Sequence, residues 1–132
     1  MAGQFSAKVD QWVAKSQRRL TAVFRTAAEA VFDDVIDRTR VDTGYMRASF
    51  QVTLNEPRLL KRGEGPEAGA AYPSPSYSLA IAGAKIGDVI YGSFTAEYAP
   101  VWEFRDGMVR LAAQAWPQHV ANAVAAAKVR VG

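Results

Sequence analysis

The chain has 132 residues, the size of a single domain, and we treat residues 1–132 as one domain. Apolar residues make up 49% and charged residues 22%, which excludes a disordered, collagen-like or disulfide-rich protein. Because the chain has no cysteine and one histidine, His119, it cannot build a disulfide, a thiolate nucleophile or a two-histidine metal site. The net charge of +3 suits a position near nucleic acid without requiring one.

The sequence contains no segment that predicts a transmembrane helix or a signal peptide. No apolar run approaches the ~20 residues that span a bilayer, and the first residues lack the apolar core of a signal peptide. We therefore expect a protein that stays in the cytoplasm or joins an assembly there.

The first 40 residues predict one long helix. Neither proline nor glycine interrupts the segment from Gln4 to Asp42. About 33 helical residues would span about 50 Å, which is longer than so small a domain can cover. Either part of the helix packs on another subunit, or it bends back onto its own sheet. Its apolar residues recur every three or four positions, at Phe5, Val9, Trp12, Val13, Leu20, Val23, Phe24, Ala27, Val31 and Val35.

The middle of the chain predicts short strands around a long loop. Residues 50–54 alternate apolar and polar side chains, as do 77–82, and residues 89–94 form a further strand. Between the first two lies a stretch of 22 residues, 55–76, that is rich in proline, glycine and charge. Loops of this length are usually functional, so we expect a projecting loop or hairpin, called the arm below. Residues 101–104 predict a short aromatic segment buried on one side.

The last part of the chain predicts a helix over residues 108–128. Asp106 is a candidate for its N-terminal cap, and Pro117 should kink or split it. The predicted class is α+β, with a long N-terminal helix and a kinked C-terminal helix. Both pack on a small, mostly antiparallel sheet of three or four strands.

One triplet suggests catalysis. Asp42-Thr43-Gly44 also occurs in retroviral-type aspartic proteases, which pair two such carboxylates across a dimer. Those enzymes need apolar strand residues before the aspartate, whereas a helix ending in Arg38 and Arg40 stands here. The alternative is a helix-to-strand turn in which Asp42 and Thr43 bond local backbone N–H groups.

Other polar residues give no stronger case for an enzyme. Asp33 and Asp37, with Asp34 between them, resemble half of a hard-metal site, or an exposed face paired with Arg38 and Arg40. His119 has no evident partner. We expect no catalytic residue, no cofactor and no metal.

The arm carries basic residues that suit phosphate. Arg58, Lys61 and Arg62 could touch a DNA backbone without reading sequence, or contact a neighbouring subunit. Acidic residues dilute this charge, at Glu56, Glu64 and Glu67.

Two stretches together resemble a known family. Residues 41–50 read VDTGYMRASF, and residues 97–104 read EYAPVWEF and precede the last helix. In this order, after a long N-terminal helix, they resemble the head–tail connector and tail-completion (neck) proteins of lambdoid-type siphophages. The family pattern has Leu where Met46 stands and Gly directly after the position of Phe104.

The resemblance implies a structural role in a virion. Such proteins form a ring, expected here to be a hexamer, at the neck between capsid and tail, close to the DNA in the channel. Its neighbours would be connector or stopper proteins on one side and tail terminator or tail tube proteins on the other. It would assemble in the host cytoplasm. The matching positions are Asp42, Thr43, Gly44, Arg47, Ser49, Tyr98, Ala99 and Glu103.

The residues themselves suggest roles for some of these positions. Arg47 could pair with Glu103 or Asp42, and Tyr98 and Trp102 are amphipathic aromatics suited to an interface. Support within the subunit is the alternative for all of them. The rival function is a DNA-binding or DNA-packaging accessory protein acting as a small oligomer.

Overall fold

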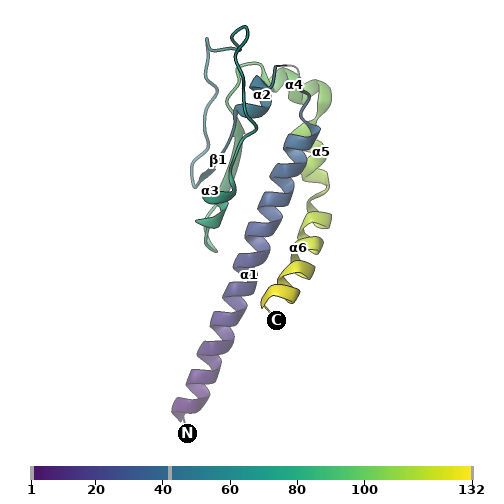
Figure 1. Cartoon of the computed structure of the whole chain (residues 1–132). Coiled ribbons are helices and arrows are strands. Elements are labelled where there is room, and N and C mark those ends of the chain that lie inside the picture. Colours follow the sequence, from purple (N-terminus) through teal and green to yellow (C-terminus); the bar gives the residue numbers. More distant parts are fainter. Residues whose placement is uncertain (1, 42, 132) are drawn as a thin grey trace.

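A computed structural model of the chain describes residues 2–41 and 43–131. One long helix, α1, runs through the molecule, with a two-stranded sheet and α3 on one side and α5 and α6 on the other (Figure 1). The elements in chain order are α1 (Ala2–Arg38), α2 (Tyr45–Ala48), β1 (Phe50–Leu54), α3 (Ser78–Ala82), β2 (Ile90–Phe94), α4 (Ala99–Asp106), α5 (Met108–Gln114) and α6 (Trp116–Val131).

The predicted class is confirmed, and the predicted strand count is wrong. The structure mixes helices with an antiparallel sheet, but among the described residues that sheet has two strands instead of three or four. Residues 78–82 are helical because Tyr77 and Ile81, four residues apart, are both buried, and the Ile81 N–H donates to the Tyr77 carbonyl. A stretch this short fits the helical period as well as the strand period.

The aromatic segment 101–104 is also helical, as part of α4. Pro100 occupies the first turn of this helix, where a missing backbone N–H costs nothing. The expected burial is wrong for the last residue of this segment, because Phe104 is 90% exposed.

The two-stranded sheet lies against α1 through one apolar face. β1 and β2 pair antiparallel, with Phe50 opposite Phe94 and Val52 opposite Gly92. The rings of Phe32 on α1 and Phe50 meet edge to face, 5.5 Å apart. Gly92 leaves the space for both rings, because a Cβ there would lie 2.5 Å from Phe50 Cζ and 2.6 Å from Phe32 Cε1.

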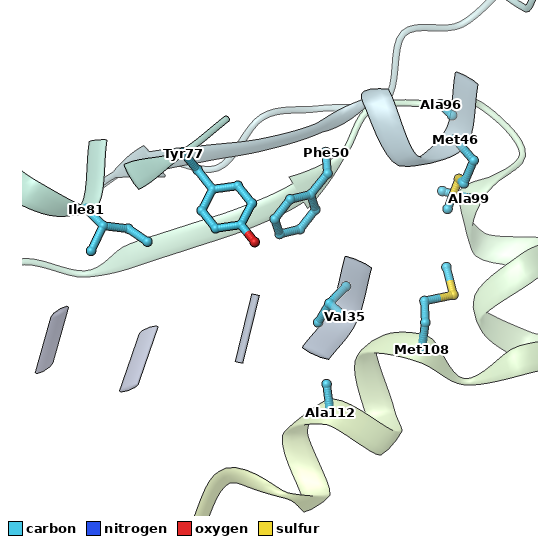
Figure 2. Close-up of a cluster of buried hydrophobic side chains, with 9 residues drawn as sticks. All are labelled: Val35, Met46, Phe50, Tyr77, Ile81, Ala96, Ala99, Met108 and Ala112. Atoms are coloured by element: carbon cyan, nitrogen blue, oxygen red, sulfur yellow. The ribbon is translucent and has the colours of Figure 1, made fainter. Parts of the chain in front are cut away.

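The core joins the two sides of α1 at its C-terminal end. Figure 2 shows Val35 of α1 between Phe50 of β1 and Ala112 of α5, with Met46 and Met108 beside Ala99. Tyr77 and Ile81 extend this cluster toward α3. Each segment from α1 to α5 thus contributes to one apolar cluster.

The C-terminal helix divides as predicted, at Ala115, just before Pro117. The expected cap is wrong: Asp106 pairs with Arg40 at 2.8 Å, and Gly107, with φ 63°, stands at the start of α5. α6 packs on α1 through small residues, of which Ala123 and Ala127 are buried. A polar contact also joins the two helices, since His119 Nε2 lies 3.0 Å from Asp34 Oδ2.

The first part of α1 extends past the end of α6 (Figure 1). Between Gln4 and Leu20, every side chain whose burial is described is exposed, apart from the half-buried Ser16. We call residues 4–20 the projecting segment. The helix therefore does not bend back onto its own sheet.

Replacing Gly92 with alanine should destabilise the fold. The added methyl group would force Phe32 or Phe50 from its position, at a cost of about 1–3 kcal/mol in the free energy of unfolding. Urea unfolding measures this change. Gly65→Ala is the control, because a Cβ at Gly65 meets nothing within 4 Å. Equal stability of the two variants would contradict the packing described.

The contact between α6 and α1 should make stability depend on acid pH. Burial alone raises the pKa of the Asp34 carboxyl, but hydrogen bonds with His119 and Arg38 outweigh it and hold the pKa below its ordinary value of 3.8. The stabilisation is therefore complete above that value and is lost as the pH falls through the lower pKa of the folded state.

Asp34→Asn should cost about 1–2 kcal/mol at pH ~7, and the difference from the original chain should vanish in acid. Urea unfolding across this pH range measures both effects. Asp37→Asn removes the same charge from an exposed position on the same helix and serves as the control. An undiminished difference at low pH would contradict the proposed role of the Asp34 carboxylate.

Candidate interaction surface

The first motif forms the turn between α1 and α2. Gly44 has φ 87°, a conformation that favours glycine, and α2 begins directly after it. The Thr43 hydroxyl accepts a hydrogen bond from the Tyr45 N–H at 3.2 Å. Asp42 lies outside the described residues. The geometry of Thr43 and Gly44 therefore matches the predicted alternative to a protease site, a turn that follows the helix.

Arg47 and Ser49 bind neighbouring backbone within the subunit. An Arg47 guanidinium N–H donates to the Thr39 carbonyl at 3.2 Å, while the Arg47 Nε atom is buried without a hydrogen-bond partner. The Ser49 hydroxyl donates to the Met46 carbonyl at 2.7 Å, and the Ser49 carbonyl accepts from the Thr95 hydroxyl at 3.0 Å. These contacts fix the end of α1 to α2 and to the start of β1.

The second motif lies beside the first. The Tyr98 ring is 6.2 Å from that of Tyr45 and 5.4 Å from that of Trp102, and Ala99 is buried in the core. Tyr98 and Trp102 are half-buried in the subunit. The structure thus brings the two motifs together inside one chain, and a role of their aromatic residues between subunits stays a prediction.

One alternative predicted an ion pair between Arg47 and Glu103, but the Glu103 carboxylate has other partners. It accepts hydrogen bonds from the backbone N–H groups of Val109, at 2.9 Å, and Arg110, at 3.0 Å. These N–H groups begin α5 and have no partner within the helix, so the carboxylate caps it. The other alternative for Arg47 was an ion pair with Asp42, which lies outside the described residues.

The acidic cluster on α1 has partners in the protein. Arg38 pairs with Asp34 at 2.7 Å, as one alternative expected, whereas Arg40 pairs with Asp106. The Tyr77 hydroxyl donates to Asp33. Over residues 2–41 and 43–131, no group of three acidic or histidine residues could hold a metal ion. Nor is any helix in this described part long and apolar enough to cross a membrane.

The base of the arm lies beside β2. The Lys61 N–H donates to the Thr95 carbonyl at 2.8 Å, and Lys61 forms an isolated parallel bridge with Ala96. The Arg58 N–H lies 3.3 Å from the Ser93 hydroxyl. The side chains of Arg58, Lys61 and Arg62 are exposed, so a contact with DNA or a neighbouring subunit is sterically open.

An extended apolar surface lies on α1. Its first part, the apolar stripe, is a row of exposed side chains on the projecting segment: Val9, Trp12, Val13 and Leu20. Its second part is a groove of about 480 Å³ where α1, the turn before β2 and α6 meet. This α1 groove is lined mainly by Leu20, Phe24, Ile86, Trp116 and Val120, with Asp88 at its edge. The periodicity of α1 predicted the stripe, but no local pattern marks the groove.

No family model, curated protein or solved structure matches this chain.

A double-mutant cycle can distinguish two roles of the Glu103 carboxylate, the cap of α5 and an ion pair with Arg47. Glu103→Ala should lower the free energy of unfolding by about 1 kcal/mol, because two N–H groups of α5 lose their acceptor. Arg47→Ala should add to this loss with a coupling energy below about 0.5 kcal/mol. A coupling energy well above that value would show that the two side chains interact after all.

Proposed function

We propose that this chain is a structural virion protein, a ring-forming subunit at the head–tail junction of a tailed phage or a phage-derived particle. The ring would join the capsid connector to the tail around the DNA channel, without enzymatic activity. The resemblance of residues 41–50 and 97–104 to neck proteins supports this proposal. The structural observation that carries it is the apolar stripe, which its own chain leaves uncovered.

The stripe needs a partner that supplies an apolar surface. Trp12 is 69% exposed, and every other side chain between residues 4 and 15 whose burial is described is exposed as well. The α1 groove lies farther along the same continuous helix, so the stripe of one chain cannot enter its own groove. A second copy can satisfy both, with the stripe of one subunit in the groove of the next.

The stripe and the groove can meet in a two-fold dimer or in a ring. In an antiparallel dimer they would meet twice, so that neither surface is left for a third copy. A head-to-tail contact leaves one stripe and one groove free at each step, and when it closes it forms a ring. The resemblance to ring-forming neck proteins favours the second arrangement.

The opposite end of the subunit offers a surface for the neighbouring ring. α4 and the tip of the arm lie at the end away from the N-terminus (Figure 1). The almost fully exposed Phe104 on α4 is suited to an apolar contact with a connector, stopper or tail protein. An elongated subunit with apolar residues at both ends suits a protein that links two assemblies.

Light scattering of the full chain, alone and with tail tubes or capsids, tests the proposal. We expect a ring of about six copies, or a monomer that forms one on the particle. Trp12→Gln should weaken subunit association at least 30-fold, or by about 2 kcal/mol, because a large aromatic anchor is lost. Since Trp12 is exposed in the monomer, monomer stability should hardly change.

Leu79→Gln is the matched control. Leu79 is 88% exposed on α3 and does not line the α1 groove, so its replacement should leave association unchanged. A chain that stays monomeric with both particles, or that assembles equally well without Trp12, would refute the proposed ring contact.

A further inference from the structure

We infer that one face of the projecting segment binds the phosphate backbone of duplex DNA without reading its sequence. This basic face consists of Lys8, Lys15, Arg18 and Arg19, all exposed on α1. The inference deepens the proposed function, since it names the residues that would meet DNA in the channel.

The projecting segment carries the whole net charge of the protein. Residues 4–20 contain four basic residues and one acidic residue, a net charge of +3, which equals that of all 132 residues. The remaining charges of the chain therefore balance. The cation nearest in sequence beyond the segment, Arg25, is turned inward and donates to the Ala84 carbonyl at 2.8 Å.

Helix geometry places these cations on one side of the rod. At about 100° per residue, Lys8, Lys15, Arg18 and Arg19 fall within an arc of about 100°. From Lys8 to Arg19 they cover about 16 Å of the helix axis, a length that matches about five phosphates of one DNA strand. Asp10, the acidic residue of the segment, lies outside this arc, about 80° beyond Arg18.

The basic face and the apolar stripe occupy neighbouring arcs of the helix. One subunit can therefore bind its neighbour through Trp12 and Val13 and still present Lys8, Lys15 and Arg18 to a different partner. In a ring built by the proposed contact, repetition of this face would produce a continuous positive band. Such a band complements the uniform negative charge of duplex DNA.

The arm is a weaker candidate for the same ligand. Arg58, Lys61 and Arg62 share their loop with an equal number of acidic residues: Glu56, Glu64 and Glu67. Glu64 and Glu67 line one hollow with Tyr45 and Tyr72, next to Gly63, so the arm surface there is acidic. A phosphate backbone would meet both signs of charge on the arm, but mainly one sign on α1.

An anionic membrane is a less suitable partner than DNA. A helix that lies in a membrane interface has a wide apolar face opposite its cations. Here the stripe has the half-buried Ser16 in its middle and continues into the α1 groove, a concave surface that a flat membrane would not fill. DNA phosphates that contact Lys15 and Arg18 would leave the stripe free for the next subunit.

Two triple variants with equal charge change provide the test. Fluorescence anisotropy would follow binding of a labelled duplex of about 30 base pairs between about 50 and about 200 mM salt. The helix variant is Lys8→Gln with Lys15→Gln and Arg18→Gln. The arm variant is Arg58→Gln with Lys61→Gln and Arg62→Gln.

The helix variant should lower the slope of log affinity against log salt by about 2.7, because three phosphate contacts are lost. Over this salt range, three contacts account for about a 40-fold change in the affinity of the original chain. The arm variant should keep the original slope.

Three results would overturn the inference: no DNA binding by the original chain at low salt, equal losses in both variants, or a larger loss in the arm variant. Binding to phosphatidylserine vesicles without binding to DNA would assign the face to membranes instead. Light scattering of the same variants separates this inference from the ring proposal, since the helix variant keeps Trp12 and should still assemble.

Discussion

The packing of Phe32 against Phe50 over Gly92 is the contact on which the fold depends. An isolated pair of strands is at best marginally stable in water, so β1 and β2 need an apolar surface to cover one face. α1 supplies that surface, and the absence of a side chain at Gly92 allows the two rings to reach the strand. Val35, one turn farther on, faces α5 as well as β1 (Figure 2). One helix therefore holds both sides of the core.

Sequence reasoning succeeded where a pattern was long or chemically unambiguous. The long helical period of α1 and the alternation in β1 were predictable because several residues repeat each pattern. The break near Pro117 was predictable because proline lacks the backbone N–H that a helix needs. It failed for α3, where five residues fit two periods, and it assigned no secondary structure to residues 101–104, which lie in α4. It also failed for Glu103, because the carboxylate caps a helix that begins five residues later in the chain. The α1 groove could not be predicted, as Phe24, Ile86 and Trp116 meet only in the folded chain.

The two motifs and the interaction surfaces have separate roles in the molecule. Thr43, Gly44, Arg47 and Ser49 shape the connection from α1 to β1, and Glu103 shapes the start of α5. These residues act within the subunit, so their resemblance to neck proteins bears on how the chain folds. The proposed contacts with other molecules lie outside the motifs, on the projecting segment and on α4. The two sets of residues can therefore be changed independently.

The uncovered length of α1 has a consequence for the dynamics of the free subunit. Residues 21–38 already provide the nucleus of the helix, so the projecting segment is helical by propagation alone. Each of its residues adds only a few tenths of a kcal/mol, and β-branched residues such as Val9 and Val13 add less than alanine. Such a helix opens from its N-terminus far more often than the core unfolds. A partner that covers Trp12 would suppress this fraying, so that helix formation at the N-terminus and association become one coupled equilibrium.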